Sequence, residues 1–413
     1  MVLEVKKHMQ ERRRDLTIDH TSGTDAGRSR WARLRKGRLL LVMVLLAGML
    51  ALSWVAGCSC QKDEQTPAAA RPVKKVAKVV TCPLCGRVVL DPAALDRRPV
   101  AIKVENDPAA RPQSGLDRAC LVYEEITEGG ITRFMAIYLD READPVGPVR
   151  SARPVDIDLV FPYGALFAHC GAGDPVLVMI KQAGLLDIDE FGWGGAFWRT
   201  SDRRAPHNLY TSAARIRQAG DVSYPFQQVV SSPFKFLTDV GVAKMVEARA
   251  AEQRRAASAA QNATQSATQS AATEYQPTVA VVNNVVIPYE SACTVTWSYD
   301  PATNTFARFV AGVPHTDRIS GRQLRADTVI VQYVVEAPSG LYDVNGAMSP
   351  ELGALGSGRA QVFVAGQVID GNWQKSAREQ HTRFYDNAGR EVPIKPGSTW
   401  IELVPTTRQA AVS

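Results

Sequence analysis

Several motifs that identify common enzyme mechanisms are missing from this chain of 413 residues. It has no G-x-S-x-G nucleophile elbow, no Walker A phosphate loop and no H-E-x-x-H zinc-protease motif. Cys82 and Cys85 have the spacing of half a zinc site, but no second C-x-x-C or H-x-x-x-H supplies the other ligands. We interpret this pair as a local disulfide or free thiols, with zinc and a redox motif as alternatives. The sequence therefore indicates no cofactor and no bound metal.

A basic surface of the kind that binds nucleic acid is also missing. The formal charge is +6, but residues 1–57 hold eleven Lys and Arg against five acidic residues, which accounts for all of it. Residues 58–413 are therefore neutral, and they contain no long basic run. Because nucleic-acid affinity depends mainly on neutralising phosphates, we expect no nucleic-acid partner.

The N-terminus has the pattern of an export signal. Basic residues lie between positions 33 and 38, an apolar run covers residues 39–52, and Val55-Ala56-Gly57-Cys58 follows. Small residues before a cysteine are typical of a lipobox, in which Cys58 receives acyl chains such as palmitate and becomes the first mature residue. An uncleaved transmembrane helix is the alternative. Both interpretations place residues 61–413 outside the cytoplasmic membrane.

Composition divides the chain into five parts. Hydrophobic residues make up 45% of the sequence, which is enough for two folded domains with cores of their own. Ala, Gln, Ser and Thr dominate residues 247–274, a pattern typical of an exposed linker. We predict a signal peptide with lipobox (1–57), a flexible tether (58–81), an N-terminal α/β domain (82–249), a low-complexity linker (250–275) and a C-terminal β-rich domain (276–407).

Hydrophobic patterns predict an α+β fold. In the N-terminal domain, apolar strands are expected at 100–104, 119–124, 132–139 and 165–170, and Asp174-Pro175 favours the start of a helix over 176–186. Strands interleaved with helices indicate an α/β layered sandwich. Seven short strands separated by turns predict a smaller, mostly β C-terminal domain, built as a sandwich or curled sheet: 279–287, 294–299, 305–310, 328–335, 361–364, 381–385 and 399–404.

Five motifs, in order, resemble the YerB-type family of bacterial lipoproteins. They are RRPVA (97–101), ARPQSGL (110–116), EGGITRF (128–134), GPVRSARP (147–154) and APHNLY (205–210), and the C-terminal GSG (356–358) and PGSTWI (396–401) extend the match. The resemblance implies an envelope lipoprotein with an N-terminal α/β layered domain and a separate C-terminal domain. It implies no reaction, because the family is known chiefly as a domain of unknown function. Cys85 stands where a small polar residue is expected, which weakens the zinc interpretation further.

These motifs also contain the candidate ligand-binding residues. Arg150 and Arg153 lie in one proline-flanked turn, where two guanidiniums would form a clamp for carboxylate or phosphate. His207 lies on a loop, and histidine is suited to proton transfer near neutral pH. The predicted set is Arg133, Arg150, Arg153, His207, Asn208 and Glu124, with no catalytic residue assigned. The alternative is that the arginines form structural ion pairs with Glu124, Glu125 or Glu128.

We therefore predict a lipid-anchored, extracytoplasmic lipoprotein of uncharacterised activity. Its N-terminal domain would bind an anionic ligand in a cleft lined by Arg133, Arg150, Arg153 and His207, and its C-terminal domain would position that ligand or bind a partner. The expected partners are the membrane, through the lipid, and a cell-wall component or envelope protein. Two alternatives are an envelope hydrolase or transferase acting on cell-wall or polyprenyl-phosphate substrates, and a protein–protein scaffold.

The lipid anchor can be tested by labelling. Cys58→Ser removes the thiol that would be acylated, so a bacterial host fed a palmitate analogue should produce wild-type protein that is labelled and a variant that is not. Cys60→Ser, two residues further along, should keep the label. Labelling of the Cys58→Ser protein equal to wild type would rule out this anchor.

Overall fold

The computed structural model describes residues 79–225, 230–263, 280–343 and 346–413. The predicted signal peptide, Cys58 and all but the last three residues of the predicted tether lie outside these ranges. Val76–Ser413 form one compact unit. Within the described ranges, no helix is both long enough and apolar enough to cross a membrane. The unit combines helices with extensive sheet, so the predicted α+β class is confirmed.

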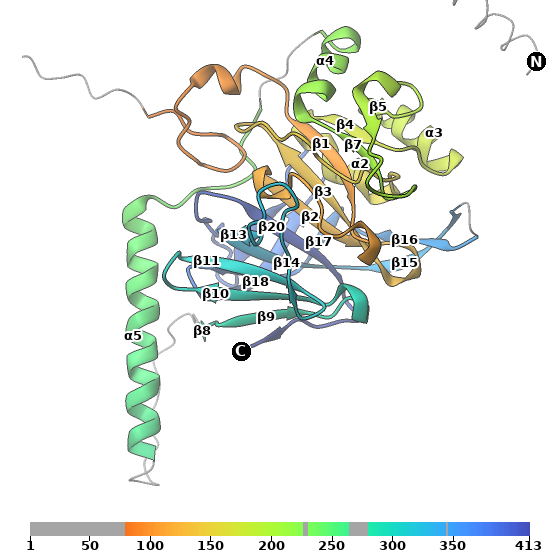
Figure 1. Cartoon of the computed structure of the whole chain (residues 1–413). Helices are drawn as coiled ribbons and strands as arrows, with labels where there is room; N and C mark the ends of the chain where they lie inside the picture. The colour runs from red at the N-terminus through yellow and green to blue at the C-terminus, as the bar shows by residue number, and fades with distance from the viewer. Residues whose placement is uncertain (1–78, 226–229, 264–279, 344–345) are drawn as a thin grey trace, which may run out of the picture. The chain divides into compact units, whose positions relative to one another are not determined.

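An eleven-stranded sheet links the two halves of the chain (Figure 1). Its order is β19-β18-β17-β14-β20-β2-β3-β1-β4-β5, and β8 pairs with β18 beside this path. The N-terminal half contributes β1 (Val100–Glu105), β2 (Leu121–Ile126), β3 (Thr132–Tyr138), β4 (Leu166–His169) and β5 (Leu186–Asp189). The C-terminal half contributes β8 (Ala280–Val281), β14 (Thr328–Val334), β17 (Gly356–Val364), β18 (Gln367–Lys375), β19 (Arg383–Asp386) and β20 (Thr399–Pro405).

The junction between the halves is a parallel strand pair. β20 runs beside β2 from Thr399 opposite Leu121 to Leu403 opposite Glu125. Continuous backbone pairing joins the strands of the C-terminal half to the N-terminal sheet. The predicted domain boundaries themselves stay predictions.

A second, six-stranded sheet packs on the central one. It consists of β9 (Asn284–Ile287), β10 (Val295–Asp300), β11 (Thr305–Val310), β12 (Val313–Pro314), β13 (Arg325–Ala326) and β21 (Ala411–Val412). Trp297 of β10 meets Trp400 of β20 edge-on, with ring centroids 5.2 Å apart, and Trp400 meets Phe134 of β3 at 5.5 Å. Residues along β10 alternate between buried and half-buried, as a strand with one face on a core requires. The β-sandwich therefore exists, but its other sheet includes N-terminal strands.

Helices cover both faces of the N-terminal strands. Side chains of α2 (Pro154–Val160) and α3 (Asp174–Ala183) share a core with one face of β1–β3, and α4 (Ala213–Ser223) packs on the opposite face. Gly173 caps α3, so the helix begins at Asp174, two residues before the predicted range of 176–186, and Pro175 lies in its first turn. Two hairpins complete the unit: β6 (Phe197–Arg199) with β7 (Leu209–Thr211), and β15 (Glu336–Tyr342) with β16 (Met348–Leu352).

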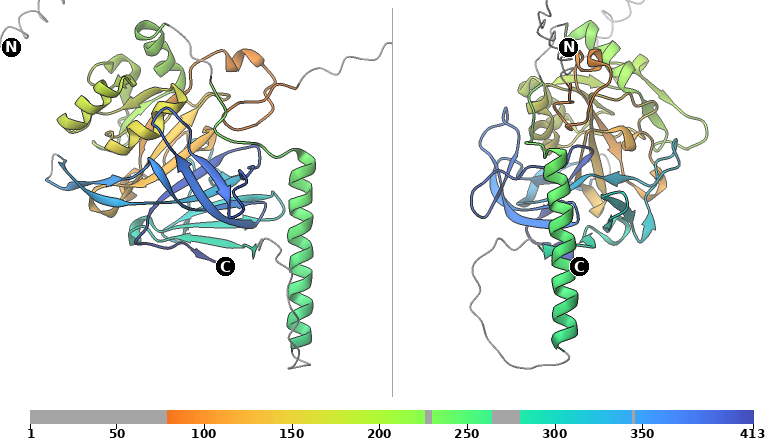
Figure 2. Two further views of the ribbon diagram at one scale, coloured as in Figure 1. Left: turned by 180° about the vertical axis from the view of Figure 1, so that it is seen from behind. Right: turned by 90° about the vertical axis from the view of Figure 1, so that its left-hand side faces the viewer.

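The predicted linker at 250–275 needs correction in its first part. A 25-residue helix, α5 (Asp239–Ala263), includes residues 250–263, which we interpreted as part of an exposed linker. Figure 2 shows this helix along one edge of the body. It is anchored near its start, where Arg249 Nε donates to the carbonyl of Gly366 (3.0 Å) and the Met245 carbonyl accepts from Gln367 Nε2 (2.8 Å). Alanine, arginine and glutamate are strong helix formers, which explains a helix without a continuous apolar face. Residues 264–275 lie outside the described ranges.

Arg308 of β11 joins the two sheets through a buried ion-pair network. Its Nη2 lies 2.6 Å from Glu124 Oε2 of β2, and its Nη1 lies 3.1 Å from Glu402 Oε1 of β20. Burial and the neighbouring Glu124 raise the pKa of Glu402 well above its usual range. All three side chains are fully buried. Three aromatic rings surround the guanidinium, with centroids 4.7, 5.1 and 5.4 Å from its carbon: Trp400, Trp297 and Phe134.

Removing this arginine should destabilise the protein strongly. Arg308→Leu leaves the Glu124 carboxylate without its counter-charge in a dry interior, so the free energy of unfolding should fall by about 3–5 kcal/mol. Urea denaturation measures the change. The matched control is Arg325→Leu, which breaks the half-exposed pair of Arg325 and Asp300 and should cost about 0–1 kcal/mol. Similar losses in both variants would contradict the central role of Arg308.

Candidate functional site

One face of β1, β2 and β3 carries charges where a core would have apolar side chains. The register places Arg133 of β3 opposite both Glu105 of β1 and Glu125 of β2. Lys103 lies on this same face, because alternate strand residues share a face. Its ammonium is fully buried against Glu125 and lies 2.6 Å from Asp156 Oδ1 of α2. Burial lowers the pKa of Lys103 to about 8, and the nearby Asp156 opposes this shift.

Glu105 connects two of the predicted site residues. Its Oε1 lies 2.9 Å from Arg150 Nε, and its Oε2 lies 3.0 Å from His207 Nδ1. The Glu105 side chain is 1% exposed, whereas those of Arg150 and His207 are each 24% exposed. A buried carboxylate thus orients two side chains that keep contact with solvent. Bonding at Nδ1 leaves the Nε2 of His207 as its second polar atom.

Arg133 and Arg153 share a single carboxylate. Arg153 Nη2 pairs with Glu128 Oε2 at 2.5 Å, and Arg133 Nη2 lies 3.9 Å from the same oxygen. Each guanidinium also donates to a backbone carbonyl at 2.8 Å, Arg133 to Ser151 and Arg153 to Ala152. Burial and the nearby Arg153 lower the pKa of Arg133 to about 9, so its guanidinium remains charged at neutral pH. The structural ion pair that we considered therefore exists between Arg153 and Glu128, whereas Arg150 pairs with Glu105 instead.

The three arginines line one cavity of about 540 Å³. Its floor includes Gly171, Ala172 and Gly173, which lead into the first turn of α3. Backbone N–H groups and the positive end of a helix dipole favour an anion at such a place. The β15–β16 hairpin and the turn after β15 also line the cavity, through Gly340, Leu341, Tyr342 and Asp343.

Two buried donors in this region are unused. The Nε atoms of Arg133 and Arg153 are shielded from solvent and have no hydrogen-bond partner among the described residues. Buried polar atoms are normally paired, and exceptions often mark functional positions. Both guanidiniums therefore retain bonding capacity beyond their contacts with Glu128 and the backbone.

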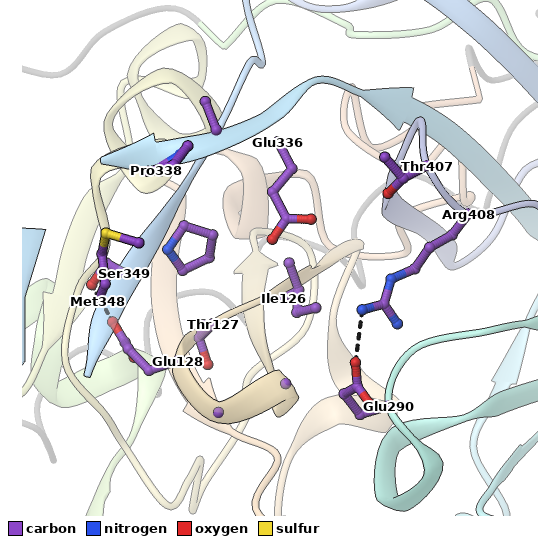
Figure 3. A pocket seen from close by; sticks show the side chains of 14 residues that line it. Ile126, Thr127, Glu128, Glu290, Glu336, Pro338, Met348, Ser349, Thr407 and Arg408 are labelled. Carbon is purple, nitrogen blue, oxygen red and sulfur yellow. Dashed lines mark hydrogen bonds and ion pairs between the residues drawn. The ribbon is translucent and has the colours of Figure 1, made fainter. Parts of the chain in front are cut away.

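A smaller cavity of about 420 Å³ adjoins this one, and Figure 3 shows its lining. Ser349 lines both cavities, and its hydroxyl donates to Glu128, the carboxylate that Arg133 and Arg153 share. Across this second cavity Arg408 pairs with Glu290 at 2.8 Å (Figure 3). The only arginine on its wall is therefore already neutralised, which makes it a weaker anion site.

The predicted site residues divide into three groups. Arg133, Arg150 and Arg153 all line one cavity. His207 contacts Glu105 but does not line the cavity, and Asn208 is bonded locally, accepting from Arg199 and donating to the Thr200 carbonyl. Glu124 lies elsewhere: it points to the opposite face of β2, where Arg308 neutralises it.

Sequence reasoning missed Glu105 and Lys103, which lie behind the arginines. Glu105 ends β1 one residue after the strand that we predicted, so the alternation of side chains already placed it on the face of Lys103. Neither residue could be linked to Arg133 without knowing that β1 and β3 pair. Among the described residues, one group could ligate a metal, and it lies outside this cavity: Cys82, Cys85, Cys120 and Asp140.

Comparison with known proteins assigns this α+β chain to a protein family of unknown function. Residues 84–224 match the family described as "Protein of unknown function (DUF3048) N-terminal domain", and residues 285–401 match its C-terminal domain. The chain is 31% identical, over 361 residues, to "Putative lipoprotein YerB" of Bacillus subtilis, covering 86% of this chain and 93% of that protein. The chain belongs to this YerB family.

A solved structure supports the same assignment. The crystal structure of YerB from Bacillus subtilis superimposes with a TM-score of 0.64 and 26% identity. The match covers 81% of this chain and 99% of that one. The resemblance inferred from the five motifs is therefore confirmed in both sequence and fold.

The charge of Lys103 should leave a signature in the pH dependence of stability. The pKa of Lys103 is about 8 in the folded protein and 10.5 in an unfolded chain. Between these pH values the unfolded chain therefore binds more protons than the folded protein. The contribution of Lys103 to stability therefore rises with pH across this window, by at most about 1.4 kcal/mol per pH unit. Urea denaturation at pH 8–10 should show this rise in wild type and its loss in Lys103→Met. Lys244→Met, on the exposed side of α5, is the control, and parallel curves for wild type and Lys103→Met would contradict the shift.

Proposed function

We propose that this protein is a membrane-anchored, extracytoplasmic lipoprotein that binds an anionic cell-envelope ligand in the cavity of Arg133, Arg150 and Arg153. The observation that carries the proposal is the convergence of these guanidiniums on one cavity, with buried Nε donors to spare. A volume of about 540 Å³ falls within the range of small-molecule sites.

The location rests on two supports. The N-terminal sequence has the three-part pattern of an export signal ending in Cys58, and the relative that covers most of this chain is described as a putative lipoprotein. Acyl chains on Cys58 would hold the body at the outer side of the cytoplasmic membrane. The ligand would then be a component of the membrane surface or the cell wall.

The charge distribution favours an anion as ligand. Three guanidiniums line the cavity, whereas neither of their partner carboxylates, Glu105 and Glu128, lines it. A carboxylate or phosphate would accept from several donors at once, and bidentate bonds to arginine are among the stronger hydrogen bonds in proteins. The loop that leads into α3 also lines the cavity, and the positive end of a helix dipole favours an anion.

The two alternatives have less support. An enzyme would need a group that moves protons beside the ligand, and His207, the best candidate, is bonded to Glu105 away from the cavity wall. A scaffold would have no use for buried cationic donors around an open cavity. Binding without chemical turnover is the function that the described geometry supports best.

The test is a binding titration of the full chain in detergent. Inorganic pyrophosphate and N-acetylmuramic acid serve as phosphate and carboxylate probes, with heat of binding as the readout. Arg150→Gln removes one charged donor worth about 1.5–3 kcal/mol, so affinity should fall by roughly tenfold or more. Its melting temperature should fall only slightly, because Glu105 keeps its contact with His207 and the nearby positive charge of Arg133.

Arg359→Gln is the matched control. Arg359 forms a half-exposed pair with Asp370 at 3.5 Å and does not line the cavity, so this variant should bind like wild type. The proposal fails if wild type binds neither probe, or if both variants lose affinity equally. A large loss of stability in Arg150→Gln without loss of affinity would assign Arg150 to a structural ion pair.

A further inference from the structure

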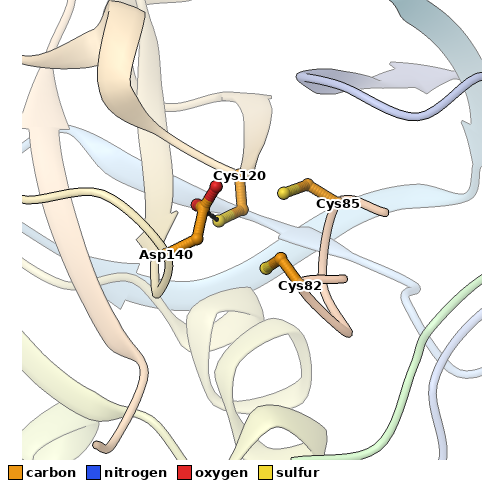
Figure 4. Close-up of side chains that lie close together, drawn as sticks. All are labelled: Cys82, Cys85, Cys120 and Asp140. Atoms are coloured by element: carbon orange, nitrogen blue, oxygen red, sulfur yellow. Dashed lines mark hydrogen bonds between the residues drawn. The ribbon is translucent and has the colours of Figure 1, made fainter. Parts of the chain in front are cut away.

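Three cysteines and an aspartate from distant parts of the chain converge outside the arginine cavity. Cys82 and Cys85 lie in the turn that opens the described chain, Cys120 directly precedes β2, and Asp140 follows the end of β3. Figure 4 shows the three sulfurs and the carboxylate directed toward one another. Their ligand atoms all lie within 4.8 Å of one another.

We propose that Cys82, Cys85, Cys120 and Asp140 together bind one zinc ion in a four-coordinate structural site. Sequence alone supplied only half of this set, because the other two ligands are separated from the C-x-x-C pair by the whole of β1 and more. Thiolates select zinc among the common divalent ions, and one carboxylate completes a tetrahedron.

The distances suit a small tetrahedral ion. Zinc bonded to sulfur at about 2.3 Å places neighbouring sulfurs about 3.8 Å apart, so the group needs to contract only slightly. Cys120 Sγ already donates to Asp140 Oδ1 at 2.9 Å. A zinc ion would replace this shared proton and bond both atoms. All three thiols are fully buried and the Asp140 side chain is 5% exposed, so the ion would be closed off from solvent as structural zinc is.

The local backbone presents the first two sulfurs from one side. The N–H of Gly86 donates to the Cys82 carbonyl, and the N–H of Cys82 donates to the Arg87 carbonyl, both at 2.8 Å. This tight turn requires φ of +68° at Gly86, where a Cβ would also lie 2.7 Å from the ring of Phe236. Only glycine therefore fits at the position that closes the C-x-x-C loop.

Arg87 provides the support that metal-binding carboxylates usually have. Its Nε donates to Oδ2 of Asp140 at 3.0 Å and its Nη2 donates to Oδ1 at 3.3 Å. Oδ1 also accepts from the Cys120 thiol, and loss of that proton on zinc binding would free a lone pair of Oδ1 for the metal. Such outer contacts orient a ligand and offset the negative charge of thiolates and carboxylate. Arg141 adds a second positive charge nearby, donating to the Ala119 carbonyl at 3.4 Å.

A disulfide accounts for this arrangement less well. It would consume two of the three sulfurs and leave one buried thiol beside a buried carboxylate. A zinc ion uses all four groups at once. It would also fasten the segment that follows the predicted tether to the start of β2 and the end of β3.

The experiment is metal analysis of the full chain, purified in detergent from cells grown with zinc. Wild type should contain one zinc per chain by mass spectrometry, and cobalt exchanged into the site should give the absorption of tetrahedral thiolate coordination. Cys120→Ser and Asp140→Asn should each lose most of the zinc. Cys293→Ser, a buried cysteine outside the group, should retain it.

A measurement on wild type alone covers the case in which variants fail to fold. Zinc should protect Cys82, Cys85 and Cys120 from alkylation, and a strong chelator should abolish this protection while lowering the melting temperature. The proposal is overturned by a disulfide between any two of these three cysteines, by iron in place of zinc, by metal-free wild type, or by full zinc content in Cys120→Ser.

Discussion

The buried contact of Arg308 with Glu124 and Glu402 is the constraint on which the rest of the architecture depends. Glu124 belongs to a strand of the N-terminal half and Glu402 to a strand of the C-terminal half, while Arg308 comes from the opposing sheet. One guanidinium therefore fixes the register of two neighbouring parallel strands and the distance between two sheets. Because removing one partner would leave an uncompensated charge in a dry core, other arrangements of these strands are disfavoured.

The alternation of strand β2 separates this structural network from the candidate ligand site. Glu124 faces Arg308, whereas the next residue, Glu125, faces Lys103 and the arginines on the other side of the sheet. The central sheet thus carries a sealed ionic core on one face and a partly open cluster on the other. The arginine cavity lies over the second face, where α2, α3 and the β15–β16 hairpin leave room for a ligand.

Local sequence predicted β1 to β4 and most of α3, because each depends on short-range periodicity or on one motif, but it missed β5, β6 and β7. It could not predict the pairing of β2 with β20, since nothing near Leu121 specifies a parallel partner close to the other end of the chain. Glu124 was placed in the cleft because strand parity was known but not which face was open. Cys120 could not be linked to Cys82 and Cys85 from the sequence, because only the fold brings it to them. The helix α5 was missed because its alanine-rich composition suits both a helix and a low-complexity segment.

The position of β20 has a consequence for biosynthesis. This strand follows β2 only after most of the described chain, yet it lies inside the sheet, between β14 and β2. While the polypeptide is being synthesised, β2 therefore keeps an open hydrogen-bonding edge until β20 arrives. Unpaired edges invite association with other chains, so molecules without β20 in place would be prone to aggregate or to be degraded. The insertion of β20 thus becomes a checkpoint that the topology itself imposes.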